Sequence, residues 1–440
     1  MGTTADKLAY LEGTKAAIRE AISARGVELS ESAPFREYAE RIGEIGGSGS
    51  SMPPDPAEVY ASQRPSDWLT MPVPQDNEMY ILLHVLDRIE GQELYQPTGR
   101  IYFSVSCTGS YTVEKGTVTN GAFVPDGAAA SVASGGVYKG EFTAGDCYSR
   151  TSDGMGQVMF RVRGGDILSW ETSGPDESSG FATWNIVEIA CRLPSATRMG
   201  CGHSRWEEAA LTSLRYFAWY GPNAMTDMTG MFCRCRSLQA ILALDTSKVT
   251  NMTEAFFWCS SLIALPALNT SKLTNMHGIF RECHSLYAVP ELNTSGVGDM
   301  AYAFYNCYSL RYLNWLDTWS CTTLECGFYG CHALRGIRPI CVTGYPVEGG
   351  FNGAFVMCRS LQHLEFSGES QPTDWSGDDI YLGDSPIFYP DLIALINSLP
   401  TVSGTSPGQR ILQLDAIPGT LELTQEDEQL ALSKGWLLLY

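Results

Sequence analysis

The chain has 440 residues, of which 44% are hydrophobic and 18% charged, a composition typical of folded domains rather than disordered chains. Its formal net charge of -20 repels phosphate backbones and argues against nucleic-acid binding. No apolar run is long enough for a membrane helix, and the start MGTTADKLAYLEG lacks the basic and apolar parts of a secretory signal, so we expect neither membrane insertion nor Sec-dependent export.

The first 45 residues predict a helical hairpin. Apolar residues recur at helical spacing from Leu8 to Ile22 and again from Phe35 to Ile45. A hairpin of this size cannot bury a core of its own. We therefore expect residues 1–45 to attach the chain to another protein, with a loose N-terminal appendage as the alternative.

A flexible linker and an all-β region follow. The sequence GGSGSSMPPDP at 46–56 is rich in glycine, serine and proline, which marks a domain boundary. Over 57–184 short apolar runs alternate with turn residues, which predicts a β-sandwich. The expected strands lie at 79–85, 100–107, 110–118 and 157–163, and a last one at 183–193 leads into the next domain.

Residues 185–365 repeat with a period of 24. The repeated positions are a Met column (Met228, Met252, Met276, Met300, with Leu324 in fifth place), a Phe column (Phe232, Phe256, Phe280, Phe304, Phe328), a Cys column (Cys235, Cys259, Cys283, Cys307, Cys331) and a Leu column (Leu238, Leu262, Leu286, Leu310, Leu334). A further coil supplies Phe355, Cys358 and Leu361, and Leu214 fits one period upstream. One coil cannot bury its own apolar side, so this pattern predicts a solenoid with the four columns inside. The Thr-Ser pairs of LDTSKV, LNTSKL and LNTSGV are expected to turn the chain and to bond neighbouring coils.

The unit LDTSKVTNMTEAFFWCSSL at 244–262 resembles the BspA-like leucine-rich repeats of bacterial and parasite surface proteins. Residues 1–45 resemble the helical starts of bacteriophage tail and baseplate-associated proteins. The acidic segment 366–440, which we expect to form a small α/β cap, is similar after residue 385 to the ends of phage and bacterial proteins that carry these repeats. These resemblances imply a multidomain chain made of hairpin, sandwich, leucine-rich-repeat solenoid and cap.

The cysteines are predicted to be structural. Cys235, Cys259, Cys283, Cys307, Cys331 and Cys358 form a ladder with one residue per coil, whereas zinc needs a tetrahedral cluster of closely spaced ligands. We therefore expect buried, reduced thiols and no metal or cofactor.

Catalysis is not expected. Cys283–His284 and Cys331–His332 could form a nucleophile and its base only if their side chains converged, and consecutive residues in a coil point apart. The chain carries no G-x-S-x-G elbow, P-loop or dinucleotide fingerprint. We accordingly predict that the protein is not an enzyme and has no catalytic residues.

The variable outer positions are the candidate binding surface. Aromatic and arginine side chains dominate interface energetics, so the candidate contact residues are Trp258, Tyr287, Arg311, Tyr312 and Trp315. Ordinary surface aromatics are the alternative. Asp374, Asp378, Asp379 and Asp384 could gather around calcium, but their spacing matches no EF-hand loop and a solvated acidic loop is the preferred interpretation.

These observations lead to one functional expectation and two alternatives. The resemblances imply a phage tail or baseplate-associated protein of the fibre or receptor-binding type, made in the host cytoplasm and located in the virion. Residues 1–45 would bind tail proteins, and the solenoid would bind a host-surface glycan or protein. A homotrimer would fit, because tail fibres resembling this chain are often trimeric. The first alternative is a leucine-rich-repeat adhesin at a bacterial cell surface; the second is a glycan-active enzyme, which a carboxylate pair in a groove of the sandwich would favour.

Overall fold

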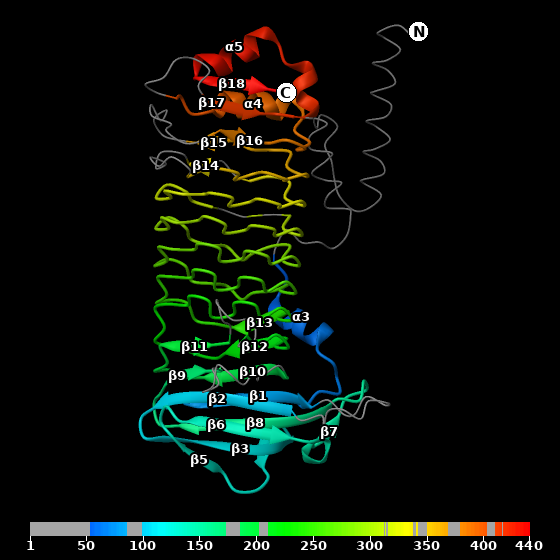
Figure 1. Ribbon diagram of the computed structural model, residues 1–440, viewed down its shortest axis with the longest axis vertical. Helices are drawn as coiled ribbons and strands as arrows, with labels where there is room; N and C mark the ends of the chain where they lie inside the picture. The colour runs from blue at the N-terminus through cyan, green and yellow to red at the C-terminus, as the bar shows by residue number, and fades with distance from the viewer. Residues whose placement is uncertain are drawn as a thin grey trace, which may run out of the picture. The chain divides into compact units, whose positions relative to one another are not determined.

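The computed structural model describes residues 53–85, 99–172, 185–201, 210–311, 313, 316–337, 340–341, 350–367, 379–402, 410–415 and 417–440. Residues 54–440 form one compact unit (Figure 1). The hairpin predicted for 1–45 lies outside the described residues, as does the linker before Pro53. None of the described helices is both long and apolar enough to cross a membrane.

The N-terminal part of this unit is built from two sheets. Among the described residues, one sheet has the order β13-β12-β10-β1-β8-β3-β4, with β5 on β3 and β7 on β8, and the other has the order β11-β9-β2-β6. The helical and strand segments here are α3 (Pro56–Gln63), β1 (Glu78–Val85), β2 (Gly99–Cys107), β3 (Ser110–Thr119), β4 (Ala122–Pro125), β5 (Ala130–Ala133), β6 (Val137–Phe142), η1 (Ala144–Asp146), β7 (Ser149–Arg150), β8 (Gly156–Gly164), β9 (Ile167–Glu171), β10 (Ile186–Arg192), β11 (Arg198–Gly200), β12 (Tyr216–Trp219) and β13 (Ala240–Ala243). The five strands predicted from the sequence are present as β1, β2, β3, β8 and β10.

The larger sheet continues into the solenoid. Strand β1 pairs antiparallel with β8 and β10, so that Ile81 lies between Phe160 and Ile189. Beyond β10 the pairing becomes parallel, first to β12 and then to β13. The sheet therefore contains strands from both sides of the predicted domain boundary, and the β-rich region and the first coils share backbone hydrogen bonds and one hydrophobic core.

The predicted solenoid is confirmed as a β-solenoid of about eight turns (Figure 1). Parallel bridges join successive coils at two positions, as in Asp227↔Asn251 and Ala240↔Ala264. Between the bridges each coil is a run of overlapping turns. Alternate backbone N–H groups, such as those of Phe256 and Trp258, donate to carbonyls of the next coil at 2.9 and 2.8 Å. These bonds satisfy backbone groups that the interior would otherwise leave unpaired.

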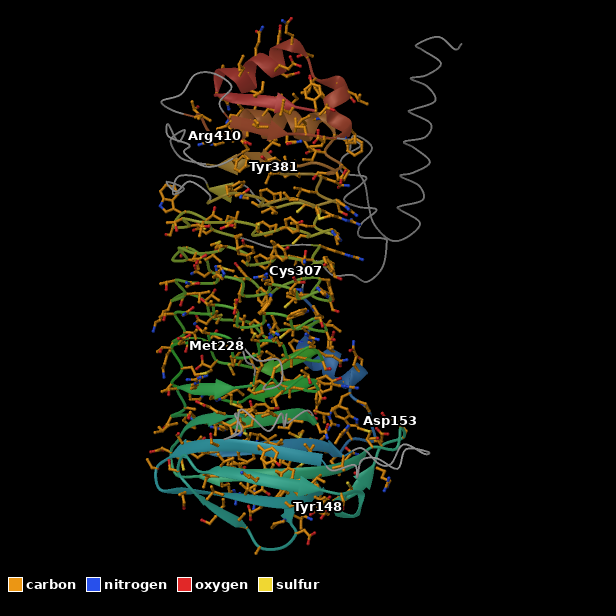
Figure 2. All side chains as sticks on the ribbon, viewed as in Figure 1. Tyr148, Asp153, Met228, Cys307, Tyr381 and Arg410 are labelled. Atoms are coloured by element: carbon orange, nitrogen blue, oxygen red, sulfur yellow. The ribbon has the colours of Figure 1, made fainter. Side chains whose placement is uncertain are left out.

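The core columns fill the space inside the coils. The phenylalanine rings stack from coil to coil, with centroids 5.3 Å apart for Phe256–Phe280 and 5.7 Å for Phe280–Phe304. Met252, Met276 and the column cysteines are fully buried, and Figure 2 shows Cys307 among the stacked coils. Packing between coils therefore supplies the burial that a single coil lacks.

The Thr-Ser pairs turn the chain as predicted, and the threonine hydroxyls of two of the three pairs also bond the next coil. The Asp245 carboxylate accepts a hydrogen bond from the Ser247 backbone N–H at 2.9 Å, and Asn293 accepts one from Ser295 at 3.2 Å. These side-chain to backbone bonds form the turn. The buried hydroxyl of Thr294 donates to the Asp317 carbonyl of the next coil at 2.7 Å, which ties neighbouring coils together.

Two helices and a parallel sheet lie at the C-terminal end of the solenoid (Figure 1). Sheet order is β16-β17-β18. The elements of this part are β14 (Ile340–Cys341), β15 (Phe366–Ser367), β16 (Ile380–Tyr381), α4 (Tyr389–Ser398), β17 (Arg410–Gln413), η3 (Pro418–Glu422), α5 (Gln425–Ser433) and β18 (Trp436–Leu439). Helix α5 begins with a capping box in which Thr424 and Asp427 bond each other's backbone N–H.

Candidate binding surface

Every coil makes the same left-handed turn beside the core. The residue six positions after the core methionine has a positive φ, between 56° and 65° at Arg234, Trp258, Glu282 and Asn306. Side chains other than glycine rarely adopt this conformation. The turn keeps the Phe and Cys columns inside and places the residues around it on the outside. The same edge of each coil therefore carries a variable set of side chains.

We call this set the aromatic edge. It consists of Arg234, Arg236, Phe257, Trp258, Arg281, His284, Tyr302, Tyr305, Tyr308, Tyr329 and His332. All of these side chains are half-buried except Tyr308, which is exposed. They come from five successive coils, so the edge follows the direction in which the coils stack.

Arginines and rings alternate on the first coils of the edge. The guanidinium groups of Arg234 and Arg236 lie 5.4 and 4.6 Å from the centre of the Trp258 ring. The Arg281 guanidinium lies 5.2 Å from each of three rings, those of Phe257, Tyr302 and Tyr305. Contacts at these distances are cation–π interactions. They hold long, flexible side chains in one arrangement.

Stacked rings form the later coils of the edge. Tyr305 stacks on Tyr329 with centroids 4.8 Å apart. Tyr308 is sandwiched between the His284 ring at 4.6 Å and the His332 ring at 4.9 Å. The faces of the middle rings are thus covered by neighbours, and ring edges and hydroxyl groups remain for a partner.

Acidic groups beside the edge order its polar atoms. Glu282 accepts hydrogen bonds from the Asn306 amide at 3.1 Å and bonds the His284 ring at 2.9 Å. Burial and a hydrogen bond to Glu325 raise the pKa of Tyr302 to about 12. A hydrogen bond to Asp299 raises the pKa of His277 above its ordinary value. The Tyr302 hydroxyl therefore stays protonated at neutral pH and donates to the Glu325 carboxylate at 3.0 Å.

The predicted contact residues fall in two different columns. Trp258 belongs to the aromatic edge. Tyr287 and Arg311 lie five positions further along their coils, where the Arg311 N–H donates to the Tyr287 carbonyl at 2.9 Å. Within the described residues no hydrogen bond or ring contact joins Trp258 to either of them. Tyr312 and Trp315 lie outside the described residues.

Sequence reasoning missed most of the aromatic edge. The prediction rested on two columns, that of Trp258 and that of Tyr287 and Arg311, and did not include the neighbouring columns of Tyr305 and Tyr308. Their signal is present in the sequence, because Tyr305 and Tyr329 are one period apart, as are His284, Tyr308 and His332.

The column cysteines are hydrogen-bonded core residues. Each Sγ donates to a backbone carbonyl of the preceding coil, for example Cys259 to Phe232 at 3.0 Å, Cys283 to Phe256 at 3.1 Å and Cys307 to Phe280 at 3.1 Å; the same holds for Cys235, Cys331 and Cys358. Burial raises the pKa of these thiols. A protonated thiol is a poor nucleophile.

The two Cys-His pairs diverge. The Cys283 thiol points into the core, whereas the His284 ring lies on the surface against Tyr308. His332 likewise stacks on Tyr308 while Cys331 is fully buried. Neither histidine can act as the base for its neighbouring thiol.

The candidate calcium ligands are only partly described. Asp374 and Asp378 lie outside the described residues. The Asp379 carboxylate accepts a hydrogen bond from the Ile411 N–H at 2.7 Å, and Asp384 adopts a φ of 66°. Among the described residues no group of three or more His, Cys, Asp or Glu side chains is arranged to hold a metal.

A family profile described as "Mycoplasma protein of unknown function, DUF285" matches residues 220–336. That span contains the coils that carry the aromatic edge. The coils fit a BspA-like repeat protein. No curated protein and no solved structure matches the chain. The resemblance of residues 1–45 to phage tail proteins stays a prediction.

Proposed function

We propose that this BspA-like chain is a phage tail or baseplate-associated protein of the receptor-binding type, which binds a host-surface ligand along its solenoid. The aromatic edge is the observation that carries this proposal. Its tryptophan, tyrosine and arginine side chains are the types that contribute most to binding energy at interfaces. They are also fixed before any ligand arrives.

Pre-organisation makes the edge suited to binding. Ordering a flexible side chain at an interface costs about 0.5–1.5 kcal/mol. Arg281 is already held among three rings, and Tyr308 is already held between two. Much of that ordering is therefore complete in the folded chain, which leaves more of the contact energy for affinity.

The stacking favours a protein ligand over a glycan at this edge. A sugar ring packs best on a free aromatic face, but the faces of Tyr308 are covered by His284 and His332. Exposed ring edges, hydroxyls and guanidinium groups suit the mixed polar and apolar surface of a protein. A host-surface protein is accordingly the first candidate ligand.

The remaining parts take supporting roles in this proposal. Residues 1–45 attach the chain to the tail, and the sandwich predicted for 57–184 acts as a spacer. An adhesin on a bacterial surface would use the same edge without the tail attachment. Immunogold labelling of purified particles and of whole bacteria separates these two locations.

The edge is tested by removing rings that the core does not need. We expect Tyr305→Ala combined with Tyr308→Ala to leave the fold intact and to weaken binding to host cells at least about tenfold. The matched control is Trp319→Ala, because Trp319 is an exposed solenoid aromatic, 53% accessible, outside the edge. Cell binding that survives the double change would contradict the proposal. Loss of binding in the control alone would move the site to the column of Trp319.

The attachment is tested separately. A chain lacking residues 1–53 retains the compact unit Pro54–Tyr440. We expect this fragment to bind host cells as the full chain does and to be absent from assembled particles. Normal incorporation into particles would place the attachment elsewhere.

A further inference from the structure

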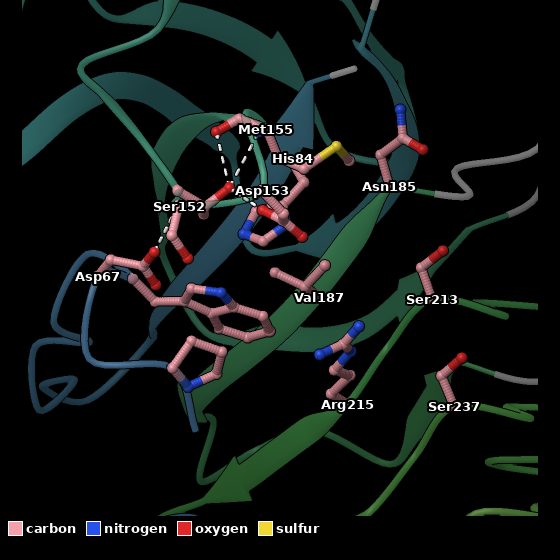
Figure 3. Close-up of a pocket in the computed structure, with 13 residues that line it drawn as sticks. Asp67, His84, Ser152, Asp153, Met155, Asn185, Val187, Ser213, Arg215 and Ser237 are labelled. Carbon is pink, nitrogen blue, oxygen red and sulfur yellow. Dashed lines mark hydrogen bonds between the residues drawn. The ribbon is translucent and has the colours of Figure 1, made fainter. Parts of the chain in front are cut away.

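A pocket of about 270 Å³ opens where the β-rich region meets the first coils (Figure 3). Its walls come from the segment after α3, the end of β1, the loop before β8, the start of β10, and the residues that precede β12 and β13. Gln157 fixes one wall: its side chain donates to the Asp67 carbonyl at 2.7 Å and accepts from the Leu69 N–H at 2.9 Å. These two bonds hold Trp68 in place.

The histidine of this pocket has an unused nitrogen. His84 is 7% exposed and meets the Trp68 ring edge-on, with ring centres 4.7 Å apart. Its Nε2 atom is buried and has no hydrogen-bond partner among the described residues. Burial lowers the pKa of His84 to about 4, so at neutral pH the ring offers one donor and one acceptor. Because this nitrogen has almost no accessible surface, His84 contributes its ring to the pocket wall rather than a hydrogen bond to a ligand.

Two carboxylates and one guanidinium add charge to the walls. Asp67 accepts a hydrogen bond from the Ser152 N–H, and Asp153 accepts one from the Thr151 hydroxyl. These bonds lower the pKa of both carboxyls, which therefore remain ionised acceptors. The Arg215 guanidinium lies 5.5 Å from the centre of the Trp68 ring.

The pocket lies beside the first residues of two columns of the solenoid. Ser213 and Ser237 line it and are one period apart; the same column continues through Ser261 and beyond. Arg215 is one period before Gln239 and begins the column that later contains Tyr287. The hydroxyls of Ser213 and Ser237 make no hydrogen bond with the described residues.

We propose that this pocket binds a single neutral sugar ring, held by the polar groups of Asp67, Asp153, Arg215, Ser213 and Ser237. The ligand class follows from the charges. An anion would meet two carboxylates, and a simple cation would meet the guanidinium group. A ring bearing several hydroxyls donates to the carboxylates and accepts from Arg215 and from the serines. The volume lies just below the range of about 300–1,000 Å³ typical of drug-sized ligands, which suits one ring rather than a chain.

The pocket binds the sugar without cleaving it. Glycoside hydrolysis requires a protonated carboxylic acid beside an ionised one. The pKa values of Asp67 and Asp153 are both lowered, so neither carboxyl carries a proton to donate at neutral pH. The pocket is thus a recognition site distinct from the aromatic edge.

The test uses the full chain and four methyl glycosides, those of glucose, galactose, mannose and N-acetylglucosamine. Saturation-transfer NMR is expected to detect binding of at least one of them. We expect Arg215→Ala and the double change Ser213→Ala with Ser237→Ala each to weaken that binding at least about fivefold, since hydroxyl partners are removed. The serine pair decides the matter if Arg215→Ala does not fold.

Controls separate this site from the proposed function. Tyr305→Ala with Tyr308→Ala should leave sugar binding unchanged. The pocket variants should leave cell binding through the aromatic edge unchanged. Failure of all four glycosides to bind would overturn the proposal, as would unchanged binding in Arg215→Ala. Preferential binding of inorganic phosphate would show an anion site instead, and release of methanol would show cleavage.

Discussion

Phe280 shows how one residue stabilises several coils. Its fully buried ring stacks between Phe256 and Phe304, so truncation removes contacts on both faces. We expect Phe280→Ala to lower the free energy of unfolding by about 3–5 kcal/mol, measured by urea denaturation. The control Trp319→Ala should change it by less than about 0.5 kcal/mol, because Trp319 is a surface residue. A loss below about 1 kcal/mol for Phe280→Ala would mean that the column is not tightly packed.

The protonation of His84 should make stability depend on pH. The ordinary pKa of 6.5 falls to about 4 in the fold, because burial disfavours the charged ring. The nearby carboxylates of Asp153 and Asp67 raise this pKa, and the guanidinium groups of Arg215 and Arg64 lower it. The unfolded chain therefore binds the proton more tightly, and the contribution of His84 is complete above about pH 6.5 and is lost as the pH falls towards 4.

Between about pH 7 and pH 5, the free energy of unfolding should fall by about 2 kcal/mol because of His84. Urea denaturation of the wild type and of His84→Gln at both pH values measures it. The variant lacks the titrating ring, so its stability should fall less on acidification. Equal losses in the two proteins would show that His84 is not the responsible group.

Individual residues were predictable where burial imposes one residue type. The Phe and Cys columns could be identified because the interior accepts a narrow set of shapes at each position. Tyr305, Tyr308 and His284 could not be ranked in this way, since a surface position tolerates rings, arginines and serines alike. The pocket beside His84 could not be predicted from the sequence either, because its walls come from segments far apart in the chain.

At the scale of the coil, the buried threonines offer a matched pair. Thr294 is fully buried and donates to Asp317 of the next coil, whereas Thr270 is 3% exposed and its hydroxyl has no partner among the described residues. We expect Thr294→Val to cost about 1–2 kcal/mol of stability, and Thr270→Val to be neutral or stabilising. Urea denaturation measures both. Equal effects would contradict the assigned hydrogen bonds.

The cysteine ladder should be chemically inert in the folded protein. Each thiol is buried, donates to a carbonyl and has a raised pKa, all of which suppress the thiolate that reacts. A chromogenic thiol reagent should label Cys259 and Cys283 slowly in native buffer and should detect all 14 thiols in denaturant without reductant. Several missing thiols in fresh protein would show that disulfides form.

The elements themselves were predictable to different degrees. The coils could be predicted from the period and from the turn residues, because the Asx turns at Asp245, Asn269 and Asn293 recur one period apart. The strands over 79–85 and 157–163 could be identified from their apolar runs, but their partners could not. Pairing of β1 with β10 joins residues more than a hundred positions apart, and no local pattern specifies it.

At the scale of the whole molecule, one sheet joins strands from both sides of the predicted domain boundary, so that the first coils stack on the β-rich region. Strand β10 pairs with β1 on one side and β12 on the other. The other face of this sheet is covered as well. A second buried cluster there contains Val59, Trp68, Tyr216 and Ala264. Removing residues before 185 would expose both the edge of β10 and this cluster.

Two fragments test this dependence. Residues 54–440 should unfold in one cooperative transition at the temperature of the full chain, because the compact unit is complete. Residues 185–440 should unfold at a lower temperature and bind a hydrophobic dye, since the uncovered first coils expose an unpaired strand edge and apolar side chains. Calorimetry and dye fluorescence measure the two effects. If 185–440 unfolded at the same temperature without binding dye, the coils would be stable alone, and the β-rich region would be a separate domain placed against them.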